Sequence, residues 1–69
     1  MDSAKITMKN QNVVTISGLK EIRTIDILGE NTTTDFSDFA LTNHGGDIRF
    51  IGDQIFTTNV NQIESILFE

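Results

Sequence analysis

Cysteine and proline are absent from this sequence, and histidine occurs once. Without cysteine the chain forms no disulfide and no thiolate metal site, a residue usage that suits a reducing compartment. No apolar run approaches the roughly 18 residues of a membrane span, and none follows a basic N-terminus as in a signal peptide. We therefore expect a soluble, cytoplasmic protein with no membrane segment.

The lack of proline bears on association between chains, because proline is one of the residues that blunt exposed strand edges. A chain of 69 residues is short. Such a chain buries only about 60% of the surface that its unfolded form exposes, so its core is marginal by itself. With no disulfide to add stability, we expect self-association.

Lysine and arginine are scarce in the second half of the chain, and the net charge is −5. Residues 1–28 carry four basic against three acidic side chains, whereas residues 29–69 carry one against seven. Affinity for nucleic acid depends on clustered basic side chains that displace counterions, so nucleic-acid binding is disfavoured. The acidic half is either a solvated face or a surface that docks on a basic partner protein.

Two β-hairpins are predicted from alternating apolar and polar residues on either side of a turn. The first covers residues 4–17 and turns at residues 10–12. The second covers residues 47–57 and turns at Gly52-Asp53, a pair that readily adopts the positive φ of tight turns.

A shift of 42 residues superposes the two hairpins and places Ile6 on Ile48. Apolar positions continue to match beyond the hairpins, which indicates a three-stranded unit over residues 4–28 repeated over residues 46–69, with a linker over 29–45. The expected fold is a single all-β domain. We predict a small barrel or roll of six to seven short antiparallel strands with an approximate internal twofold repeat.

The linker is read as a polar loop over residues 30–35 followed by an ambiguous segment. Alternating residues favour a strand over 38–42, although Phe36, Phe39 and Ala40 also sit at helical spacing. The core is expected to contain Ile6, Met8, Val14, Ile16, Ile25, Ile27, Phe50, Phe56, Ile66 and Phe68.

Residues that could carry chemistry are few. The single histidine, His44, lies beside two glycines and is interpreted as an exposed turn residue. Asp35 and Asp38 would share a face only in a helix, and the segment around them lacks the spacing of a calcium loop. The glycine pairs match no phosphate-binding motif. We predict no enzyme activity, no metal site and no cofactor.

The sharpest interaction hypothesis combines Asp35, Phe36 and Asp38. Of the five phenylalanines, Phe36 is the one expected to be exposed, and its acidic neighbours would make an acidic-aromatic contact point for a basic protein partner. The predicted function is a non-enzymatic protein-protein interaction module. The composition resembles that of short accessory proteins of low-GC bacteria and their phages, and we expect an accessory or inhibitor protein of a phage or mobile element. A structural self-assembling protein and an oligomer that sequesters a small ligand are the alternatives.

Overall fold

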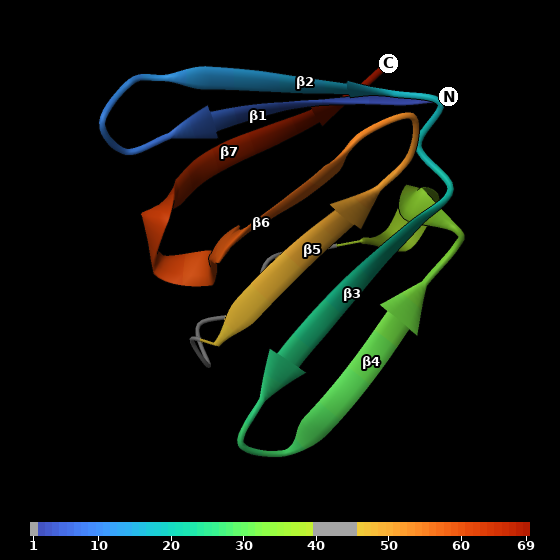
Figure 1. The fold of residues 1–69 in the computed structure, drawn as a ribbon, viewed down its shortest axis with the longest axis vertical. Helices are drawn as coiled ribbons and strands as arrows, with labels where there is room; N and C mark the ends of the chain where they lie inside the picture. Colours follow the sequence, from blue (N-terminus) through green and yellow to red (C-terminus); the bar gives the residue numbers. More distant parts are fainter. Residues whose placement is uncertain (1, 40–45) are drawn as a thin grey trace.

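The computed structural model describes residues 2–39 and 46–69, apart from the side chain of Asp38. Within these residues the protein is all-β, as predicted, with seven antiparallel strands and two single-turn 3-10 helices (Figure 1). The elements are β1 (Ser3–Met8), β2 (Val13–Ser17), β3 (Glu21–Asp26), β4 (Gly29–Thr33), η1 (Phe36–Asp38), β5 (Asp47–Ile51), β6 (Ile55–Asn59), η2 (Val60–Gln62) and β7 (Ile63–Phe68).

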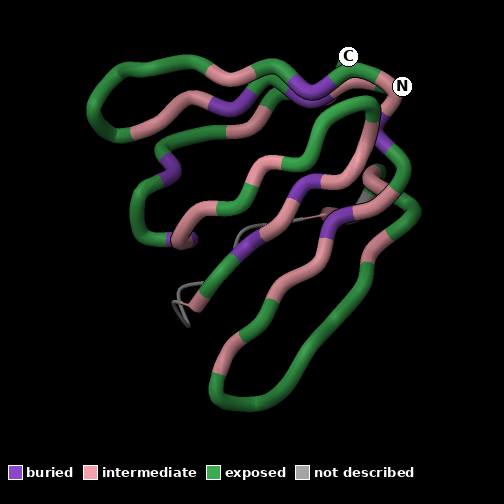
Figure 2. The backbone as a smooth tube through the Cα atoms, in the orientation of Figure 1, coloured by how far each residue is buried: buried purple, intermediate pink, exposed green. Residues whose placement is uncertain are grey.

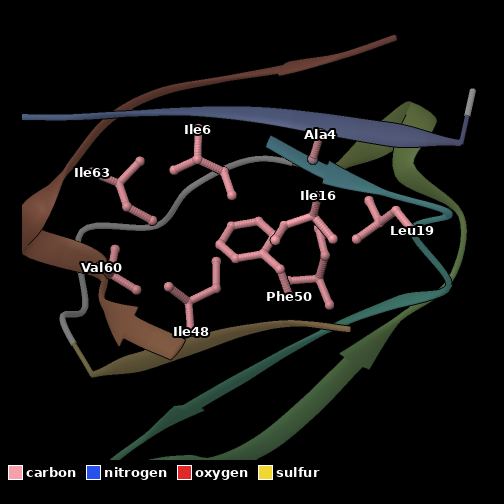
Figure 3. Packing of buried hydrophobic residues seen from close by; sticks show 9 residues of the cluster. Ala4, Ile6, Ile16, Leu19, Ile48, Phe50, Val60 and Ile63 are labelled. Atoms are coloured by element: carbon pink, nitrogen blue, oxygen red, sulfur yellow. The ribbon is translucent and has the colours of Figure 1, made fainter. Parts of the chain in front are cut away.

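The described strands form two sheets, so the barrel in our prediction is wrong. Sheet A has the order β2-β1-β7, and sheet B has the order β4-β3-β5-β6. Apolar side chains of both sheets point into the space between them (Figure 3). Alternation along each strand gives each sheet one apolar face, and the two faces are buried against each other.

Nine apolar side chains are buried between the sheets and in their connections: Ala4, Ile6, Ile16, Leu19, Ile22, Ile48, Phe50, Val60 and Ile63. Three members of the predicted core, Ile6, Ile16 and Phe50, are among them. Five more are half-buried and pack against this cluster: Met8, Val14, Phe56, Ile66 and Phe68. The remaining two, Ile25 and Ile27, are exposed, so their predicted burial is wrong.

The chain reverses direction at Ile27-Leu28, before the end of the three-stranded unit that we predicted over residues 4–28. A carboxylate oxygen of Asp26 accepts a hydrogen bond from the backbone N–H of Leu28 at 2.8 Å, and Gly29 follows with φ of +123°. The turn leads directly into β4, which pairs with β3. The predicted linker therefore begins with a strand, and residues 30–33 are not a loop. Polar residues form this strand because β3 supplies its hydrogen-bond partners.

Both predicted hairpins are present, but the second turns for a different reason. Its glycine, Gly52, does not have a positive φ. A Cβ at this position would instead lie 2.7 Å from the carbonyl oxygen of Ser17. Glycine is required here because the turn passes close to the backbone at the end of β2.

The two hairpins lie in different sheets: β7 joins the first hairpin in sheet A, whereas β3 and β4 join the second hairpin in sheet B. Ile6 and Ile48 are both fully buried. The registers differ, however, because Ile6 lies opposite Val14 whereas Ile48 lies opposite Thr58. The twofold repeat is not confirmed and stays a prediction.

Candidate interaction surface

The outer part of the β3–β4 hairpin, residues 24–32, projects away from sheet A and is called the arm here (Figure 1). Four of the five residues of β4 are exposed, and Thr33 is half-buried. Residues 27–32, which cover the turn and most of β4, are all exposed (Figure 2). Since β4 adds no side chain to the buried cluster, the arm is not explained by core formation.

The end of the arm is apolar. Ile27 is 97% exposed, Leu28 is 77% exposed and Ile25, on the outer face of β3, is 40% exposed. Single exposed apolar residues are common on protein surfaces, but three that share one hairpin end are unusual and typical of interaction sites. These three residues are called the apolar tip.

Carboxylates surround the apolar tip. Ile25 lies opposite Glu30 on one side and opposite Asp47 on the other. Asp26 is the first residue of the turn and uses one carboxylate oxygen to cap it. These three acidic residues are called the acidic rim. A guanidinium nitrogen of Arg23 lies 3.9 Å from Glu30, an exposed pair that only weakly offsets the charge of the rim.

The predicted contact point lies after the arm, at η1. Phe36 is half-buried, and its ring stacks on Phe68 with centroids 5.4 Å apart and 8° between planes. Phe39 meets the same ring edge-on at 5.9 Å. The predicted exposure of Phe36 is therefore wrong, because the ring covers the end of β7. A partner-binding role for this segment stays a prediction.

Asp35 caps η1 through its side chain. One carboxylate oxygen accepts hydrogen bonds from the hydroxyl of Ser37 at 2.7 Å and from its backbone N–H at 3.1 Å. The hydrogen bond from the hydroxyl makes the larger contribution, and the two bonds together lower the pKa of the Asp35 carboxyl below its ordinary value. Asp38 belongs to η1 by its backbone, and its side chain lies outside the described part of the structure.

Further features bear on catalysis and membranes. Residues 40–45, which include His44 and most of the predicted strand 38–42, lie outside the described residues. In the part that is described, no polar or charged side chain is buried. No group of three His, Cys, Asp or Glu in residues 2–39 and 46–69 could hold a metal ion. No helix in those same ranges is long and apolar enough to cross a membrane.

Sequence reasoning missed the apolar tip, although a signal for it was present. Asp at the first position of a turn and Gly at the fourth are typical of a type I turn, and Asp26 and Gly29 occupy those positions. The apolar pair between them concealed this signal, because Ile27 and Leu28 extend the apolar pattern of β3.

Comparison with known protein families, with curated proteins and with solved structures finds no match for this chain.

Proposed function

We propose that this chain is a non-enzymatic protein-binding module and that the apolar tip, within its acidic rim, is its contact surface. The observation that carries the proposal is the exposure of Ile27 and Leu28, at 97% and 77%, on an arm that the core does not need. Burial of apolar surface in a partner is favourable by about 25 cal/mol per Å². A docked tip would release the water that now covers both side chains.

The rim specifies the chemistry of the partner. Glu30 and Asp47 flank Ile25 on both sides, so a protein pocket that accepts the tip would be apolar at its centre and lined with Lys or Arg at its border. The same carboxylates oppose binding to nucleic acid and to anionic lipid. This agrees with the net charge of −5 and with a role as an inhibitor or accessory protein.

The segment with Asp35, Phe36 and Asp38 follows the arm and is a second contact under the same proposal. The exposed carboxylate of Asp35 would extend the charged surface, while Phe36 holds the segment against β7 through its stack on Phe68. A structural, self-assembling role is the second candidate function, favoured by the exposed edge of β4. Sequestration of a small ligand between copies stays a prediction without a supporting contact.

Affinity capture with matched variants tests the proposal. The immobilised protein is compared with Ile27→Ser/Leu28→Ser and with Val13→Ser/Ile55→Ser, a control that removes two exposed apolar side chains from other strands. We expect one protein to bind the wild type and the control but not the tip variant. Once that protein is purified, its affinity should fall as salt rises, because the rim contributes charge.

Two results would overturn the proposal. The first is capture that survives the loss of Ile27 and Leu28, which would place the contact elsewhere. The second is binding that is lost equally in the tip variant and in the control, which would indicate general apolar adhesion. Circular dichroism of each variant shows whether the fold is retained.

A further inference from the structure

We propose that β4 pairs with β4 of a second copy of this chain, so that two four-stranded sheets become one sheet of eight strands. β4 is an edge strand of sheet B and pairs with β3 without a bulge over all of Gly29–Thr33. An edge strand presents unpaired N–H and C=O groups that can bind another strand. This inference does not rest on the apolar tip.

Among the four edge strands in the described part of the chain, β4 differs from the others in its contribution to the core. β2, β6 and β7 each carry side chains that belong to the core or pack against it, such as Ile16, Phe56 and Ile66, whereas β4 carries none. Like the other three edge strands, β4 contains no lysine or proline, the residues that commonly protect an edge. It is the edge that a second chain can reach with the least disturbance of the core.

Symmetry restricts the register of such a pair. A twofold axis between two antiparallel strands is perpendicular to the sheet, so it must pass beside one residue and its own copy. An axis at Glu30 would place two carboxylates directly opposite each other, which is unfavourable. An axis at Thr32 would leave Gly29 and Glu30 beyond the end of the other strand. An axis at Asn31 pairs all five residues.

Charge also favours the axis at Asn31. It places Glu30 of each copy opposite Thr32 of the other, and Thr32 lies beside Arg23 within its own sheet. Glu30 thereby joins the row Thr32–Arg23–Arg49–Thr57, which crosses sheet B and contains both arginines of the chain. Twofold symmetry forms this contact twice.

Two substitutions at Thr32 test the pairing with opposite expected signs. Thr32→Glu would face Glu30 of the other copy and should raise the dissociation constant of the dimer about tenfold. Thr32→Lys would face the same carboxylate and should lower the constant several-fold. Because a glutamate at this position also faces Arg23 of its own chain, Thr32→Glu should remain folded.

The matched control is Thr57→Glu, on the other edge of sheet B, where Thr57 lies beside Arg49 as Thr32 lies beside Arg23. Sedimentation equilibrium over a range of concentrations should show a species of twice the chain mass for the wild type and for this control. A monomer at every concentration would overturn the proposal. The proposal would also be overturned if neither Thr32 substitution changed the dissociation constant of the dimer. Dissociation of the dimer in Thr57→Glu would overturn it as well. Ile27→Ser/Leu28→Ser should leave the dimer unchanged, which separates this result from the proposed function.

Discussion

Arg23 of β3 lies directly opposite Arg49 of β5, so the two arginines of the chain are cross-strand neighbours. Glu21 lies 2.9 Å from the Nε of Arg23, and its hydrogen bond and charge raise the pKa of that guanidinium. The Nε of Arg49 donates to the hydroxyl of Thr57 at 3.3 Å. Glu21 therefore compensates the positive charge of Arg23, whereas Arg49 donates its hydrogen bond to a neutral hydroxyl.

Removing the positive charge of Arg49 should stabilise the fold. Like charges directly opposite in a sheet are unfavourable, so we expect Arg49→Gln to raise the free energy of unfolding by about 0.2–1 kcal/mol. The gain should shrink at high salt, which screens exposed charges. Urea denaturation at low and high salt measures both effects. Arg23→Gln is the control, and a gain of the same size in it would contradict this account, because that change also breaks the pair with Glu21.

Conservative changes on the two faces of β3 test its orientation. Ile22 is fully buried and Ile25 is 40% exposed. Ile22→Val should lower the free energy of unfolding by about 0.5–1.5 kcal/mol, the usual result for a buried methylene. Ile25→Val should change it by less than about 0.5 kcal/mol, as at most surface sites. Equal losses in the two variants would mean that the outer face of β3 is covered.

A side chain at Gly52 should destabilise the protein. The added Cβ of Gly52→Ala would lie 2.7 Å from the Ser17 oxygen, so the backbone must shift. We expect a loss of about 1–3 kcal/mol, as for other overpacked sites. Asp53→Ala, at the exposed residue that follows Gly52, is the control and should have little effect on the midpoint of urea denaturation. Unchanged stability in Gly52→Ala would show that the turn relaxes freely.

The cap at Asp35 predicts a pH dependence. Since its pKa is lower in the folded than in the unfolded chain, the carboxylate adds stability above its ordinary pKa of about 3.8. That contribution disappears as pH falls through the lower, folded value. Ser37→Ala removes the hydroxyl bond and should raise the pKa of Asp35 toward its ordinary value, measured by NMR titration of the carboxyl carbon. An identical titration curve in Ser37→Ala would contradict the role of the hydroxyl.

Local patterns determined much of this fold. Alternation placed β1, β2, β5 and β6 close to their observed bounds, and the two hairpins turn where the alternation was expected to break, at residues 10–12 and at Gly52-Asp53. These features depend on residues near one another in the chain, where side-chain period and turn preference act directly. The acidic balance of the second half of the chain was also visible without coordinates.

The tertiary structure decided the features that depend on distant partners. Residues 29–33 have no strand pattern of their own, and they form β4 because β3 offers a ladder that is already held by β5. The exposure of Ile27 follows from that pairing, since the turn carries it beyond the reach of sheet A. Phe36 is covered because Phe68 lies beside it, 32 positions along the chain. The sequence alone specified which side chains are apolar and prefer burial. The pairing of the strands in the two sheets determined which of those side chains are buried.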